Sequence, residues 1–280
     1  MTTKRIAYLG PAGTFTEEAT LRYDGAATRL PHPTIDAVFA AVESRAADEG
    51  LVPIENSIEG SINVTLDLLI HQSPLHIAHE VVLPIEQCLL APRGTSVDAA
   101  QVVYSHPQAL AQCRKYLERR FPTMRQEGTL STAAAVEEAK KSKVPAVAIA
   151  PRRAAELYDV DVVERGIQDQ ANNMTRFVVL SDKDSPRTGA DRTSICVAFN
   201  DDRPGLLYAA MGEFARRNIN LSKVESRPNK QQLGRYFFLI DLEGHRTDAN
   251  VAAALDGLRR LTPSVKVFGS YPRWKATTKA

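Results

Sequence analysis

Apolar runs of strand length alternate with helix-like segments over about the first 180 residues of the chain. The runs RIAYL (5–9) and PAVAIAP (145–151) are continuous enough to predict buried strands. Residues 35–46 carry apolar side chains at helical spacing, and Thr14 with Glu17 has the spacing of a capping box, so both places predict a helix. Strands that alternate with helices predict an α/β fold with a largely parallel sheet.

Three further signals refine this pattern. Pro84 lies inside the long extended segment 77–91, which predicts an edge strand or a crossing segment there. Pro107 suits the first position of a helix, and Ser131 suits an N-cap.

The character of the chain changes near Ser181. Residues 182–192 are polar and contain proline and glycine, as a linker does. The next 80 residues or so read as strand, helix, strand, hairpin, strand, helix and strand, which is the ferredoxin-like order. We therefore expect one domain over residues 1–182 and a second domain over residues 193–272.

Composition and charge narrow the classes of protein that fit. The chain has 280 residues, 44% of them hydrophobic and 24% charged, with a formal net charge of +2 and without a long basic run. Neither nucleic acid nor a membrane is expected as a partner, and no apolar segment resembles a signal peptide or a membrane span. The three cysteines are widely spaced, which favours a reducing compartment, and we expect a cytoplasmic protein.

Neither a nucleotide nor a metal is expected. The chain contains no glycine-rich phosphate-binding motif. The nearest histidine cluster is His71, His76 and His79, but Pro74 prevents these side chains from sharing a helix face. We therefore predict no metal site and no cofactor.

Polar residues gather where several predicted strands of the first domain end. Ligands of α/β sheets bind beyond the carboxyl ends of the strands, and helix N-termini favour anions. These tips can also be turns and N-caps without any ligand, and both interpretations stay open for each of them. The tips are Gly10 to Thr14, Glu55 to Ser57, Ser105 to Gln108, and Thr175 with Arg176.

Six motifs in order resemble the prephenate dehydratase family. They are GPAGTFTEEA, PIENSIEGS, YSHPQALAQC and NNMTRFVVL in the first domain, with RPGLLY and NLSKVESRP in the second, which resembles an ACT domain. The resemblance implies loss of CO2 and water from prephenate to give phenylpyruvate, without a cofactor, in phenylalanine biosynthesis. It implies a catalytic domain of two α/β subdomains, similar to periplasmic binding proteins, with the site in their cleft and chain crossings near residues 82–90 and Arg176. No chorismate mutase segment precedes Arg5, so the monofunctional form is expected.

The resemblance also implies roles for individual residues. Thr175 is expected to donate a hydrogen bond to the leaving hydroxyl, and Arg176 to hold a substrate carboxylate. Glu55 is either an acid whose pKa is raised by burial or an ionised group that faces an arginine, and the sequence does not decide between them. Asn56 completes the catalytic set. The expected substrate-binding residues are Thr14, Ser57, Ser105, His106, Gln108 and Phe177.

In the second domain, the resemblance implies a site for phenylalanine that inhibits the enzyme. A domain that only dimerises is the alternative, and a homodimer or homotetramer is expected in both cases. The expected effector-binding residues are Gly205, Leu206, Leu207, Asn220, Leu221, Ser222, Glu225, Ser226, Arg227 and Pro228.

Two other functions stay open at this point. An arogenate dehydratase would differ only in one amino group on the substrate. A non-catalytic amino-acid sensor would share the two-lobed cleft, although it would not need a donor such as Thr175 aimed at a leaving hydroxyl.

Overall fold

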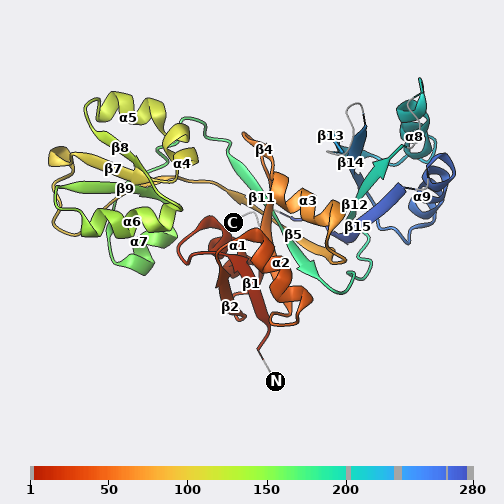
Figure 1. Ribbon diagram of the computed structural model, residues 1–280, viewed down its shortest axis with the longest axis horizontal. Coiled ribbons are helices and arrows are strands. Elements are labelled where there is room, and N and C mark those ends of the chain that lie inside the picture. Colours follow the sequence, from red (N-terminus) through yellow and green to blue (C-terminus); the bar gives the residue numbers. More distant parts are fainter. Residues whose placement is uncertain (1–2, 200–202, 230–234, 263, 276–280) are drawn as a thin grey trace. The chain divides into compact units, whose positions relative to one another are not determined.

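The computed structural model describes residues 3–199, 203–229, 235–262 and 264–275 (Figure 1). The chain divides into two compact units. The first comprises Met1–Thr65 and Val81–Phe177, and the second comprises Leu66–Glu80 and Val178–Ala280. This division into compact units is not the same as the predicted division of the sequence at residues 182–192. The predicted domain boundaries stay a prediction.

The first sheet has the strand order β2-β1-β3-β11-β5, with the short β4 paired to β3. Strand β1 pairs in parallel with both β2 and β3, and helices α1 and α2 pack on these strands. Helix α3 (Asn63–His71) follows β4 along the chain. The elements are β1 (Arg5–Leu9), α1 (Phe15–Tyr23), β2 (Thr28–His32), α2 (Ile35–Glu43), β3 (Glu49–Asn56), β4 (Gly60–Ser61), β5 (His76–Pro84) and β11 (Met174–Ser181).

The second sheet has the order β10-β6-β9-β7-β8 and lies among helices α4 to α7 (Figure 1). Strands β7, β8 and β9 are parallel, but β6 and β10 are antiparallel to their neighbours, so the expectation of a largely parallel sheet is wrong here. The elements are β6 (Cys88–Ala91), the 3-10 turn Val97–Ala99, β7 (Val102–Ser105), α4 (Pro107–Gln112), α5 (Arg114–Arg120), β8 (Arg125–Gly128), α6 (Thr132–Lys141), β9 (Ala146–Ala150), α7 (Arg152–Tyr158) and β10 (Asp161–Arg165).

The chain crosses between these two sheets twice. It leaves β5 for β6 through residues 85–87, and it returns from β10 to β11 through residues 166–173. Strand β6 enters the second sheet directly from this crossing, without a helix before it, and pairs antiparallel with both β9 and β10. The predicted two-subdomain α/β architecture is confirmed.

The second unit contains the predicted β-α-β-β-α-β order. Its sheet has the strand order β13-β14-β12-β15, all antiparallel, and its core includes Phe214, Ile240 and Leu255. This is the ferredoxin-like fold, and the prediction is confirmed. The turn of the predicted hairpin, residues 230–234, lies outside the described residues. The elements are β12 (Asp191–Ala198), α8 (Leu206–Ala215), β13 (Leu221–Pro228), β14 (Tyr236–Glu243), α9 (Ala249–Leu261) and β15 (Ser264–Pro272).

The helix starts follow the predicted capping residues. The hydroxyls of Thr14 and Ser131 accept the backbone N–H of the third residue beyond them, and Pro107 is the first residue of α4. Helix α2 ends at Glu43 rather than near residue 46, because Arg45 has a left-handed φ of 60° that stops the helix.

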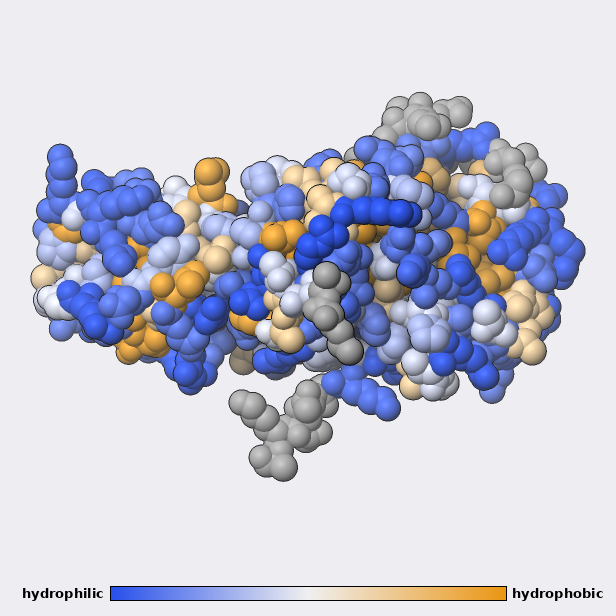
Figure 2. All heavy atoms as spheres, turned by 90° about the horizontal axis from the view of Figure 1, so that it is seen from below, coloured by the Kyte–Doolittle hydropathy of each residue, from blue (hydrophilic) through white to orange (hydrophobic). Residues whose placement is uncertain are grey.

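The face of the molecule in Figure 2 is mainly polar, with apolar side chains in small groups. Within the described ranges, no helix combines the length and the apolarity that crossing a membrane requires.

Candidate active site

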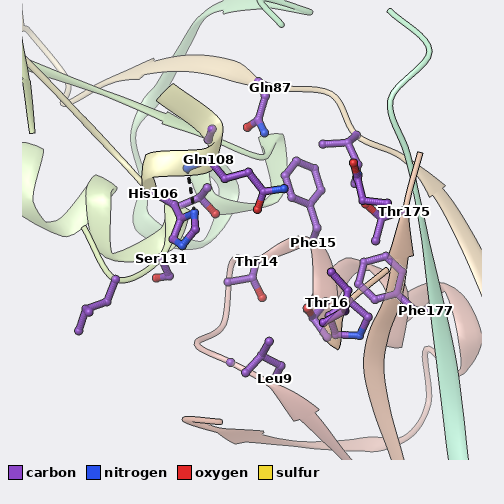
Figure 3. Close-up of a pocket in the computed structure, with 18 of the residues that line it drawn as sticks. Leu9, Thr14, Phe15, Thr16, Gln87, His106, Gln108, Ser131, Thr175 and Phe177 are labelled. Carbon is purple, nitrogen blue, oxygen red and sulfur yellow. Dashed lines mark hydrogen bonds between the residues drawn. The ribbon is translucent and has the colours of Figure 1, made fainter. Parts of the chain in front are cut away.

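A cavity of about 300 Å³ lies within the first unit, and elements of both sheets line it. This volume is at the lower end of the range for small-molecule sites. Phe15 and Phe177 give it apolar walls, and hydroxyl and amide groups supply the polar lining (Figure 3). The lining residues labelled in Figure 3 are Leu9, Thr14, Phe15, Thr16, Gln87, His106, Gln108, Ser131, Thr175 and Phe177.

Thr175 lines this cavity near the start of β11 and is 9% exposed. Its Oγ1 accepts a hydrogen bond of 2.8 Å from Nδ2 of Asn56, at the end of β3. A hydroxyl that accepts in one direction directs its own hydrogen elsewhere. The O–H of Thr175 therefore points away from Asn56 and is placed to donate.

The turn after β3 holds Asn56 in one orientation. Its Oδ1 accepts the backbone N–H groups of Ile58 and Glu59 at 3.0 and 3.1 Å. Ser57 joins the same turn to β11, since its Oγ accepts the N–H of Met174 at 2.9 Å. Ser57 is not among the residues that line the cavity, so the structure places it in the support of the site.

Glu55 and Arg176 form an ion pair of 3.1 Å, with side chains 34% and 11% exposed. Neither is among the cavity-lining residues. Successive side chains of a strand point to opposite faces, so Arg176 faces away from the cavity that Thr175 and Phe177 line. Glu55 has the arginine partner expected for its ionised form, and the proposed contact of Arg176 with substrate stays a prediction.

Of the polar residues at the end of β7, one supports the sheet and two line the cavity. The Ser105 hydroxyl is fully buried and donates to the carbonyl of Ile149 at 2.6 Å, so it fastens β7 to β9 and is not among the lining residues. His106 and Gln108 line the cavity. Nδ1 of His106 accepts the N–H of Gln108 at 3.3 Å, the dashed line in Figure 3.

Burial lowers the pKa of His106 below its usual value. Because Nδ1 is an acceptor, the neutral ring carries its hydrogen on Nε2, where it is a donor. Thr14 also lines the cavity, but its hydroxyl donates to the carbonyl of Pro11 at 2.9 Å, so it offers a ligand only its acceptor side.

Sequence reasoning missed three amide side chains at the site. Gln87 and Gln112 line the cavity, and Asn173, 1% exposed, connects Gln112 with Asn56. Gln112 had a detectable signal, because it follows Gln108 by one helical turn and lies on the same face. Gln87 and Asn173 lie in the two crossing segments, where no periodicity marks a side chain as inward-facing.

The cavity has one electrostatic property that sequence reasoning did not predict. Among the described residues that line it, none is an aspartate, glutamate, lysine or arginine. An anion here would be held by neutral hydrogen-bond donors rather than by a charged side chain.

The expected effector residues lie on separate elements of the second unit. Gly205 precedes α8 with a left-handed φ of 88°, and a side-chain carbon added there would meet no atom within 4 Å. Leu206 is buried, Leu207 is exposed, and the carbonyl of Asn220 accepts the N–H of Glu243.

Strand β13 presents its effector residues in alternation. Ser222, Ser226 and Pro228 are exposed, whereas Leu221, Glu225 and Arg227 are partly or fully buried. Glu225 pairs with Lys223 at 3.0 Å, and the guanidinium of Arg227 pairs with Asp67 at 2.7 Å. Arg227 therefore has a structural partner within its own unit.

These features define a two-sheet α/β protein with a ligand-sized cavity, joined to a ferredoxin-like unit. The family model for prephenate dehydratase matches residues 6–185, and the model for the ACT domain matches residues 194–260. The chain belongs to the prephenate dehydratase family, and the predictions of a lyase of this type and of an ACT domain are confirmed.

Relatives match almost the whole chain. The bifunctional chorismate mutase/prephenate dehydratase of Aquifex aeolicus is 44% identical over 96% of this chain and 74% of its own length. The prephenate dehydratase of Bacillus subtilis is 38% identical over 97% of this chain and 99% of its own. A structure of prephenate dehydratase from Arthrobacter aurescens in complex with L-Phe has a TM-score of 0.88, with 39% identity, 96% coverage of this chain and 90% of that one.

The Glu55–Arg176 pair gives a testable prediction. If the pair braces the two strand ends, a double-mutant cycle with Glu55→Gln and Arg176→Met should give a coupling of about 1–2 kcal/mol in unfolding free energy. The exposed Glu137–Lys141 pair, one helical turn apart at 3.4 Å, is the control and should give about 0.3–0.5 kcal/mol. A coupling no larger than the control, with a large rise in KM for Arg176→Met, would instead assign Arg176 to the substrate.

Proposed function

We propose that the protein converts prephenate to phenylpyruvate in this cavity, with Thr175 as the donor to the leaving hydroxyl. The observation that carries the proposal is the 2.8 Å bond from Asn56, which occupies the acceptor side of Thr175 and directs its O–H elsewhere. The barrier of this reaction lies in the departure of hydroxide, a poor leaving group, and a donor aimed at that oxygen lowers it.

The neutral lining suits the other half of the reaction. As the ring carboxylate leaves as CO2, its negative charge moves off the carboxylate. A cavity walled by Phe15 and Phe177 keeps water from the carboxylate and so favours its loss. The side chains of Gln108 and His106 supply neutral donors for the substrate oxygens.

Thr175 is a weak acid, so the proton that leaves with the water comes from another group. His106 has a neutral ring at the cavity and can hydrogen-bond to substrate or solvent there. Glu55, the other candidate acid, is paired with Arg176 and does not line the cavity. We therefore propose that Thr175 orients and polarises the leaving oxygen, and that the proton comes from solvent hydrogen-bonded at the cavity, where His106 can pass it on, rather than from Glu55.

The test of the function is phenylpyruvate formation from prephenate by the purified chain, beside arogenate as the alternative substrate. Turnover of prephenate at a clearly higher kcat/KM than arogenate would support the proposal. Turnover of neither substrate would overturn it and favour the sensor alternative.

Thr175→Ala should lower kcat by about 100- to 1,000-fold, because it removes a donor to charge that develops in the transition state. Thr175→Ser is the matched variant and should retain kcat within about tenfold, since it keeps the hydroxyl. Both should show nearly the denaturation midpoint of the unchanged protein. Wild-type-like turnover of Thr175→Ala would remove the assignment of Thr175.

We also propose that phenylalanine inhibits the enzyme through the second unit, since the Arthrobacter relative was solved with L-Phe. The open space at Gly205 lets a ligand approach the backbone, and Ser222 and Ser226 are exposed on β13. Strand β13 is an edge of its sheet, and such an edge can pair with another copy of the chain. A homodimer or homotetramer, active in the cytoplasm, is part of the proposal.

Gly205→Ala should raise the phenylalanine concentration for half-inhibition at least about tenfold while leaving uninhibited turnover intact, because a methyl group enters the space the effector needs. Gly94→Ala is the matched control, since Gly94 also has a positive φ, 79°, with no atom within 4 Å of the added carbon. Ser226→Ala should likewise weaken inhibition. Unchanged inhibition in both the Gly205 and the Ser226 variants would place the effector elsewhere.

A further inference from the structure

The direction of one buried amide in the first unit is fixed by backbone groups. Oδ1 of Asn56 accepts two backbone N–H groups, from Ile58 and Glu59, and an N–H cannot act as an acceptor. The amide of Asn56 therefore cannot be turned over. Its Nδ2 lies 2.7 Å from Oδ1 of Asn173 and 2.8 Å from Oγ1 of Thr175, and it donates to both.

This direction is transmitted to the neighbouring amides. Because Oδ1 of Asn173 faces Asn56, its Nδ2 must face the other way, where it donates to Oε1 of Gln112 at 3.1 Å. Nε2 of Gln87 approaches the same Oε1 at 3.4 Å. Gln112 thus accepts with its oxygen inside the network, and its own N–H groups are directed elsewhere.

Asn173 is suited to transmit this direction. Its side chain is 1% exposed, and its backbone carbonyl accepts the N–H of Ile85 at 2.8 Å, so the residue is held in both crossing segments of the chain. Asn173 does not line the cavity of about 300 Å³. It contacts Gln112 directly and Thr175 through Asn56, and both of these residues line that cavity.

We propose that Asn173 is a positioning residue that makes Gln112 offer N–H groups, rather than an oxygen, to the substrate. The inference rests on the proposed function, because a substrate with two carboxylates presents mainly acceptors. If Gln112 turned over, its oxygen would face those carboxylates and repel them. The turn after β3 fixes the direction of the Asn56 amide. Asn56 would in this way set which atoms Thr175 and, through Asn173, Gln112 direct into the cavity.

Asn173→Asp tests the inference with little change in shape. The carboxylate still accepts from Asn56, but it has no N–H for Oε1 of Gln112, so Gln112 must turn over to donate to it. At a pH where the introduced carboxyl is ionised, we expect KM to rise and kcat/KM to fall by about 100-fold.

The same variant should recover as the pH falls. A protonated carboxyl has an O–H that can replace the lost N–H, so the ratio of variant to wild-type kcat/KM should be highest below the pKa of the new group and should fall above it. Burial raises that pKa, and so do Glu59 and Asp169, which line a small cavity together with Asn173, whereas hydrogen bonds from Asn56 and Gln112 to the carboxylate lower it. The ratio should therefore be followed from high pH down to the lowest pH at which both proteins stay folded, with enzyme-free blanks.

Two controls separate this role from a structural one. Asn172→Asp, an exposed neighbour with the same chemical change, should leave the ratio near one at every pH. Asn173→Ala should lose kcat/KM without recovering at low pH, because alanine cannot donate. Thermal unfolding of each variant shows whether it is folded at the assay temperature.

The outcomes are distinct for the two proposals. A wild-type chain that turns over neither substrate overturns the proposed function. A wild-type chain that turns over prephenate, with Asn173→Asp either fully active or impaired to the same degree at every pH, overturns the role of Asn173 alone.

Discussion

The site depends on the hydrogen bonds that Asn56 makes with its single amide group. This side chain joins the turn after β3 to the crossing segment that leads into β11. Its Nδ2 reaches Asn173 and Thr175, which are close in sequence but lie more than a hundred residues after it. The side chains of Asn56 and Asn173 are buried, so removing either of them leaves buried polar groups without a partner.

This dependence explains why the two crossing segments matter more than their length suggests. Residues 85–87 and 166–173 connect the sheets, and they also carry Gln87 and Asn173 into the amide network. Asp169 adds to this, since its carboxylate accepts the N–H groups of Lys115 and Tyr116 and holds the start of α5, just after Gln112. The two segments that connect the sheets therefore also support the residues of the site.

The sequence was enough to predict most of the architecture. Periodicity and caps such as Thr14 and Ser131 located the elements, and the motif order located Thr175, Asn56, His106 and Gln108, four of the residues that line the cavity. The motif order did not take into account that side chains alternate along a strand. This alternation places Thr175 and Arg176 on opposite faces of β11, so they do not face the same cavity. The link between Asn56 and Asn173 could not be predicted, since it depends on how two distant turns meet.

The neutral lining of the cavity fits the chemistry better than a cationic one would. A fixed positive charge beside the departing carboxylate would stabilise it most in the ground state, when the charge is still localised there, and so would oppose its loss. Under the proposed function, neutral donors would hold the substrate with less of this penalty, and Thr175 would act on the leaving oxygen, where negative charge increases. Placing the Glu55–Arg176 pair on the opposite face of the strands keeps both charges out of the cavity while still joining the two strand ends. On the proposed function, Thr175 would serve catalysis in a cavity without charged side chains, while Arg176, the next residue along β11, would join the strand ends on the opposite face.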